Sequence, residues 1–296
     1  MTMSLALLAL LGVPTARAEI APECEGLPKP DDYDEQTQQD HQQNYFALVS
    51  SFSPLHAAVP HAGGRGSIGV DVGVLPPLGC AQRYVLDWTK TEDTNKSPII
   101  PKITASYAFP EIKDRLVFYG GLALLPPIPL NGTRTLLLSA ELGFGVHAAK
   151  VVDVGARFHM TLQRTYGDVA TAFTPDEPVV EDVYVGSTWG IDALLSFPVA
   201  VNEQQISPYL AAGYLDASTF FFVGDSSYAA INLHPYGGPA IAVGLDTLLV
   251  KRLRLAGEFY AAPGGFTLPD ADAEVVGGFD RYGSLYTARF RIGVEL

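Results

Sequence analysis

Charged side chains are scarce in this sequence, and basic ones are scarcer than acidic ones. Charged residues make up 17% of the 296 residues, against about 25% in an average soluble protein. Lys and Arg number 19 and Asp and Glu number 32, which gives a formal net charge of −13 at pH 7. Because a phosphate backbone is bound through a basic face, this balance excludes nucleic acid as an expected partner.

The chain also lacks a hydrophobic run long enough for a transmembrane helix. The best run, 116–130, is broken by two glycines and three prolines, whereas a span needs about 18–20 apolar residues. At the N-terminus, an apolar stretch at 5–13 is followed by Ala16-Arg17-Ala18, which has the form of a signal-peptidase site. We therefore interpret 1–18 as a secretory signal peptide, the alternative being a short buried helix.

Cysteine is rare as well, with Cys24 and Cys80 the only two. In an exported protein such a pair fits one disulfide bond. The alternative is two separate free thiols.

From residue 66 onward, hydrophobic residues recur at every second position, as in strands with one apolar face. In 152–163, Val, Val, Ala, Phe, Met and Leu alternate with Asp, Gly, Arg, His, Thr and Gln. Such strands exceed the roughly five or six residues of globular sheets and suit a tilted strand crossing a bilayer, about 9–11 residues. Ten strands are predicted, at 66–75, 98–108, 115–126, 134–147, 150–164, 182–198, 205–218, 233–249, 252–262 and 283–296.

The connections between these strands alternate strictly between longer and shorter ones. Short turns on the periplasmic side and longer loops outside are typical of an up-and-down outer-membrane barrel. Lipid-facing strands cannot leave backbone groups unpaired, so the sheet must close. The predicted fold class is all-β: a closed antiparallel transmembrane β-barrel of about ten strands, with an N-terminal helical and irregular segment. A barrel of twelve strands is left open as an alternative, because Phe220–Val223 could extend a strand.

The export signal, the loop pattern and the alternating last strand, Phe290 to Leu296, resemble those of bacterial outer-membrane β-barrel proteins. The resemblance is one of architecture and covers 66–296. In that family the last strand usually ends in an aromatic residue, and here it ends in Leu296. The resemblance implies location in the outer membrane, contact with its lipid and delivery by the barrel-assembly machinery. Oligomeric state is left open.

Residues 19–64 differ from the barrel region, 65–296. Eight of the 32 acidic residues fall within 19–40, and hydrophobic residues at helical spacing predict one amphipathic helix near 38–53. Cys80 lies in the first long loop, which should be external, whereas Cys24 starts on the periplasmic side. If the two cysteines pair, 19–64 must thread the lumen, so we expect an N-terminal plug. The alternative is a periplasmic tail.

The inward face of the predicted strands carries charges of both signs. A barrel of eight strands is filled by its own side chains, and ten leave little more room. Because unpaired buried charge is costly, we expect a network of ion pairs across the lumen rather than a wide channel of one sign. The predicted members are Asp71, Lys102, Glu141, Asp153, Arg157, His159, Asp192, Arg254, Glu258, Arg289 and Arg291.

The sequence gives only a weak indication of catalytic chemistry. His159 shares a predicted face with Asp153 and Arg157, but the pattern places no nucleophile, base and orienting acid at one height. Asp270, Asp272 and Glu274 are interpreted as solvated loop acids, and neither a metal nor a cofactor is predicted. The favoured function is an outer-membrane barrel of transport or structural type, with a narrow or plugged polar lumen that could take a small solute. The alternatives are an outer-membrane hydrolase and a soluble exported ligand-binding barrel.

Overall fold

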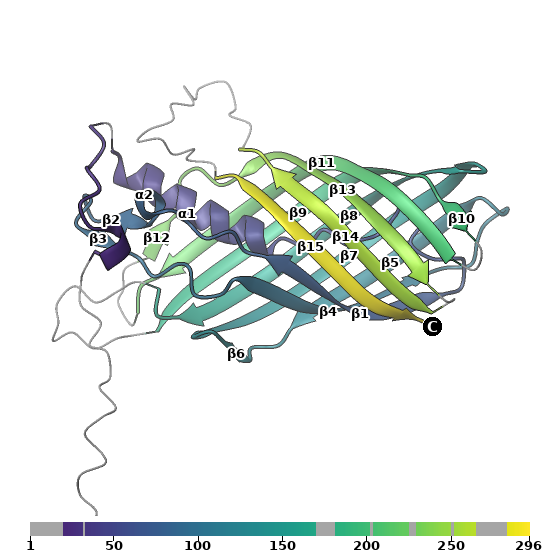
Figure 1. The fold of residues 1–296 in the computed structure, drawn as a ribbon, viewed down its shortest axis with the longest axis horizontal. Coiled ribbons are helices and arrows are strands. Elements are labelled where there is room, and N and C mark those ends of the chain that lie inside the picture. The colour runs from purple at the N-terminus through teal and green to yellow at the C-terminus, as the bar shows by residue number, and fades with distance from the viewer. Residues whose placement is uncertain are drawn as a thin grey trace, which may run out of the picture.

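The chain folds into one closed β-barrel (Figure 1). The computed structural model describes residues 20–31, 33–169, 181–201, 204–224, 229–249, 252–264 and 283–296. Within these ranges, each of ten long strands pairs antiparallel with the next along the chain, and the last pairs with the first. The predicted ten-strand barrel is thereby confirmed. The strands are β1 (Gly66–Val74), β4 (Ile99–Ala108), β5 (Leu116–Leu125), β7 (Thr133–Ala149), β8 (Val152–Gly167), β9 (Asp182–Ser196), β11 (Gln204–Phe222), β13 (Gly237–Leu249), β14 (Leu253–Ala262) and β15 (Leu285–Glu295).

The alternative of twelve barrel strands is wrong. Phe220 to Phe222 lengthen β11, pairing with β9 on one side and with the short β12 (Ala229–Ile231) on the other. Two further short strands, β6 (Pro129–Leu130) and β10 (Val199–Val201), extend turns of the same sheet.

The two ends of the barrel differ in their connections. Connections of two to seven residues lie at one end, which we call the turn end, at 109–115, 150–151, 197–203 and 250–252. Those at the other, which we call the loop end, have seven to 24 residues, at 75–98, 126–132, 168–181, 223–236 and 263–284. Within the first long loop are α2 (Cys80–Arg83), β2 (Tyr84–Val85) and β3 (Lys90–Thr91).

The outer surface of the barrel wall is apolar. Every second residue of the strands points outward, and most of these positions expose a large hydrophobic side chain, up to 68% of its surface at Leu142. The aromatic residues Tyr107, Phe144, Phe197, Phe259 and Tyr286 are also exposed. Other members of this apolar belt are Ile68, Val70, Ile103, Phe118, Leu122, Leu124, Leu138, Phe158, Met160, Leu162, Ile191, Leu210, Val243, Leu245, Phe290, Ile292 and Val294.

The N-terminal segment begins with a 3-10 turn, η1 (Pro22–Cys24), and continues into α1 (Glu35–Ser50). The helix starts three residues earlier than predicted because Asp34 caps it, accepting a 2.8 Å hydrogen bond from the Thr37 backbone N–H. It ends three residues earlier because Ser51 adopts an extended ψ of 137° and Pro54 disfavours helix before it. None of the described helices is both long and apolar enough to cross a membrane.

Two sequence interpretations fall outside the described residues. They are the signal peptide at 1–18 and the acidic loop residues Asp270, Asp272 and Glu274.

Candidate functional site

The interior of the barrel is occupied by the N-terminal segment. Helix α1 lies at the loop end and contacts β9, β11 and β15 (Figure 1). Most of its polar side chains are buried along with the apolar ones, among them Gln38, Asp40 and Asn44, each with no exposed surface. The helix is therefore covered on both faces, which an ordinary amphipathic helix at a protein surface is not.

After α1 the chain has no regular structure, yet residues 51–61 are all buried. Its backbone donors are met by side chains of the wall. The N–H of Phe52 donates to Thr161 Oγ1 (2.9 Å), that of Ala57 to Asp246 Oδ2 (3.0 Å), and that of Ala58 to Ser196 Oγ (3.2 Å). Buried backbone groups need such partners, so this part of the wall and segment 51–61 are matched to each other.

Two glycines allow the segment to approach the wall closely. A Cβ atom at Gly145 of β7 would lie 2.4 Å from the carbonyl oxygen of Ala58 and 2.7 Å from Val59 Cγ2. One at Gly155 of β8 would lie 3.1 Å from the same oxygen. Any larger residue at 145 therefore occupies space that the segment fills.

Arg157 joins the wall to the segment through three hydrogen bonds. Its Nε donates to Asp192 Oδ2 at 2.8 Å, and its Nη2 donates to Ser53 Oγ at 2.6 Å. Its Nη1 donates to the carbonyl oxygen of Pro54. His159 Nε2 lies 3.3 Å from the same Asp192 oxygen. Arg157 thus joins a carboxylate of β9 to segment 51–61.

Glu141 pairs with a histidine of the segment. His56 Nε2 lies 3.0 Å from Glu141 Oε2, and His56 Nδ1 lies 2.6 Å from the Ala57 carbonyl oxygen. Both ring nitrogens therefore lie within hydrogen-bond distance of an oxygen atom. Glu141 thus makes a second side-chain contact from wall to segment.

The remaining central charges pair along the wall itself. Arg289 forms an ion pair with Glu258, which also accepts from Tyr209 Oη at 2.6 Å. Arg291 Nε lies 3.6 Å from Asp71 Oδ1. Lys102 places Nζ 5.2 Å from the ring centroid of Phe52, a cation–π contact with the segment.

At the turn end, Arg254 organises a further cluster. Arg254 Nε donates to Asp246 Oδ1 (2.9 Å), and Nη1 approaches Glu295 Oε2 (3.4 Å) and donates to His61 Nδ1. His61 can accept this hydrogen bond only if Nδ1 carries no proton, so the ring is neutral and its Nε2–H donates to Ser106 Oγ (2.8 Å). Burial, helped by the adjacent Arg254, lowers the pKa of His61 to about 4 despite the nearby Glu295.

A polar cavity of about 240 Å³ opens beside this cluster. His147 Nδ1 lies 2.8 Å from Asp153 Oδ1 at its edge. The cavity and the cluster mark where the N-terminal segment leaves the lumen and joins β1.

All eleven predicted lumen residues are buried, each less than 6% exposed. The structure brings Arg157, His159 and Asp192 together, and it pairs Arg289 with Glu258 and Arg291 with Asp71. The other partners are residues that the prediction missed: His56, His61, His147, Asp246 and Glu295. Asp246 and Glu295 share the inward period of their strands and could have been found, whereas His56 and His61 lie in irregular chain with no periodic signal.

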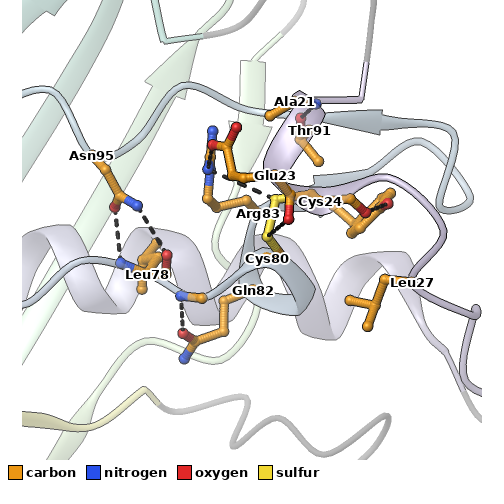
Figure 2. Close-up of a disulfide and its surroundings, with 12 residues drawn as sticks. Ala21, Glu23, Cys24, Leu27, Leu78, Cys80, Gln82, Arg83, Thr91 and Asn95 are labelled. Atoms are coloured by element: carbon orange, nitrogen blue, oxygen red, sulfur yellow. Dashed lines mark hydrogen bonds and ion pairs between the residues drawn. A yellow bond between two sulfur atoms is a disulfide. The ribbon is translucent and has the colours of Figure 1, made fainter.

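At the loop end, the N-terminal segment is tied covalently to the first long loop (Figure 2). The predicted disulfide between Cys24 and Cys80 is confirmed, with an S–S distance of 2.02 Å and Cα atoms 5.3 Å apart. Beside it, Arg83 Nη1 donates to Glu23 Oε1 at 2.8 Å and lowers the pKa of that carboxyl. The ring of Tyr84 stacks on Trp88 at 4.2 Å and its hydroxyl donates to the Cys24 carbonyl oxygen.

Polar contacts continue this attachment along α1. Gln42 Nε2 donates to the carbonyl oxygen of Gln82 at 2.8 Å, two residues beyond the disulfide. On the opposite side, His234 Nδ1 lies 2.6 Å from Asp40 Oδ2, and Asn44 donates to the His234 carbonyl oxygen. The helix is therefore held between the first long loop and the loop before β13.

No family model matches the chain, and a search of curated proteins finds no relative. Among solved structures, the toluene transporter TodX of Pseudomonas putida has a TM-score of 0.31 at 10% identity, covering 82% of this chain and 70% of TodX. The toluene transporter TbuX of Ralstonia pickettii has a TM-score of 0.30 at 12% identity, covering 96% and 77%. LpxR of Salmonella typhimurium has a TM-score of 0.27 at 12% identity, covering 77% and 99%. Similarity this distant assigns neither a substrate nor an activity to this chain.

Proposed function

We propose that this protein spans the bacterial outer membrane as a β-barrel whose lumen is occluded by its own N-terminal segment. Its function is of the transport type: the occluding segment is a plug, and solute passes when part of the plug moves. The observation that carries the proposal is the wholly buried stretch 51–61 inside a barrel whose outer surface is apolar.

The apolar belt supports a location in lipid. In water, a continuous band of exposed Leu, Ile, Val and Phe around a whole barrel is a strong aggregation hazard, since soluble monomers rarely expose large apolar patches. In a bilayer the same band is buried, and strands with apolar residues outside and polar residues inside are what a transmembrane barrel requires. The belt therefore disfavours the soluble ligand-binding alternative.

The contacts of the plug support occlusion in the resting state. Wall residues Arg157, Glu141 and Asp246 all direct side chains at 51–61. These bonds are individually breakable, whereas the disulfide holds the far end of the plug to the first long loop. Such an arrangement lets 51–61 leave the lumen without releasing the whole segment.

The hydrolase alternative gains no support from His159. That side chain is 2% exposed and faces Asp192, which Arg157 already binds. A base buried in an ion-pair cluster is placed for structural hydrogen bonding rather than for access to a substrate.

Conductance across a planar lipid bilayer tests the proposal. The full chain should give no steady current, and a variant lacking 20–62 should give steady openings, because removing the plug empties the lumen. A matched control is the full chain with Leu142→Val, a change confined to the belt, which should stay closed. Equal currents from the full chain and the truncated chain would contradict the proposed occlusion.

A further inference from the structure

A second cavity, chemically unlike the polar one, lies between α1 and the wall at the loop end. Its volume is about 80 Å³, and it is partly open to solvent. Phe46 and Val49 of α1 line one side, and Ile100, Leu125 and Leu130 line the other. Asp93 and Lys96 of the first long loop also border it, 3.5 Å apart as an ion pair.

The cavity lies where the inward row of β4 changes character. Nearer the middle of the lumen, the buried inward positions of β4 are Lys102 and Thr104. At the loop end the same inward row holds Ile100, which packs with Leu125 and Leu137 into a separate hydrophobic cluster. The alternation along β4 makes residue 100 point inward, but it does not require an apolar side chain there. An apolar lining that α1 leaves partly unfilled is what a small-molecule site needs.

One polar group in this cavity has an unmet hydrogen bond. Gln163 of β8 lines the cavity and is only 8% exposed. Its Nε2 donates to Thr165 Oγ1 at 2.8 Å, but its Oε1 has no partner. Buried acceptors are nearly always satisfied, and one that is not calls for an explanation such as a missing ligand. The unpaired oxygen thus specifies a hydrogen-bond donor on whatever fills the cavity.

We propose that this cavity binds a small apolar molecule bearing a single hydroxyl group, a phenol or a short alcohol, with the hydroxyl donating to Gln163 Oε1. The apolar body packs against Phe46, Val49 and Leu125. The enclosed room is about half that of a cavity of roughly 150 Å³ that takes benzene. A short alcohol therefore fits inside it, whereas the ring of a phenol extends from it into the open mouth. Its polar end faces β8 and its remainder faces the mouth at Asp93 and Lys96.

The inference goes beyond occlusion, since binding at this cavity does not require the plug to move. Phe46 and Val49 belong to α1, so an occupied cavity also adds contacts to the helix that precedes 51–61. Binding at the cavity is measured in the closed protein, without any measurement of conductance. Failure of the proposed binding site is therefore distinguishable from failure of the proposed occlusion.

Fluorine NMR titration of the full chain in lipid nanodiscs tests the site. The probes are para-fluorophenol and fluorobenzene, which differ only in the hydroxyl group. We expect saturable binding of both, with the phenol bound about tenfold more tightly. In Gln163→Met, which keeps the length of the side chain and removes the acceptor, the two affinities should become equal.

Two variants serve as controls. Gln205→Met makes the same chemical change at the polar cavity of the turn end and should keep the tenfold preference. Val49→Phe fills the apolar cavity, so only partition of the probes into lipid should remain. Folding of each variant is checked by SDS gel electrophoresis, in which the folded barrel in an unheated sample migrates faster than the unfolded chain in a heated one. The proposal is overturned if the folded wild-type chain shows no saturable binding, binds both probes equally, or keeps its preference in Gln163→Met.

Discussion

Arg157 shows how a single residue links the wall to the plug. One guanidinium satisfies Asp192 of β9 together with the Ser53 hydroxyl and the Pro54 carbonyl. The period of two along β8 predicts that Arg157 points inward, and the balance of charges predicts a carboxylate partner. The two contacts with the plug could not be predicted, because no pattern in 51–61 indicates where an irregular chain will lie.

Replacing Arg157 should destabilise the folded protein strongly. Arg157→Met preserves most of the side-chain volume but leaves Asp192 buried without its cation, and breaking a buried pair in this way costs about 3–5 kcal/mol. The measurement is the free energy of unfolding from urea titrations in lipid vesicles. Arg164→Met, an exposed position on the same strand, is the matched control and should change stability by at most about 1 kcal/mol. Equal losses of unfolding free energy in the two variants would contradict the role of Arg157 in joining the wall to the plug.

At the scale of elements, the strands were far easier to predict than the N-terminal segment. Each strand has one apolar face on the outside of the barrel and one face in the lumen, so its sequence repeats the same contrast many times. The helix α1 has polar contacts on nearly all sides, and its periodicity therefore marks its ends only to within three residues. Segment 51–61 has no such repeat: Ser53 and Pro54 both meet Arg157, whereas Ala57 meets Asp246.

The close fit of this segment against β7 gives a prediction at the same scale. Gly145→Ala adds a Cβ atom where the Ala58 carbonyl lies 2.4 Å away, so 51–61 should move off the wall. Hydrogen exchange at the Phe52, Ala57 and Ala58 amides should then speed up by about tenfold or more.

The control for Gly145→Ala is Gly257→Ala on β14. There the added Cβ atom meets nothing closer than a Phe290 ring carbon at 3.5 Å, an ordinary contact. Exchange at the three plug amides should be unchanged in this variant. If both substitutions, or neither, accelerated exchange, the close fit at Gly145 would not be what holds the segment.

At the scale of the whole molecule, the scarcity of charge acquires a physical meaning. The wall places its apolar residues outside and reserves its charges for the lumen, where acids and bases pair with one another and with the plug. The closed barrel, the order of its strands and the inward charged set all follow from sequence periodicity. The apolar cavity with Gln163 does not, since it depends on how α1 packs against the strands that line it.

The most direct test of the account is the accessibility of the plug in a membrane. Ala57→Cys places a thiol in the middle of 51–61, where Ala57 is 3% exposed, and Ala62→Cys places one just outside, at an exposed position. Both proteins, with the native disulfide intact, are treated in lipid vesicles with a water-soluble maleimide. We predict rapid labelling at residue 62 and, at residue 57, labelling only after unfolding. Equally rapid labelling of both thiols in the folded protein would contradict a lumen occluded by the N-terminal segment.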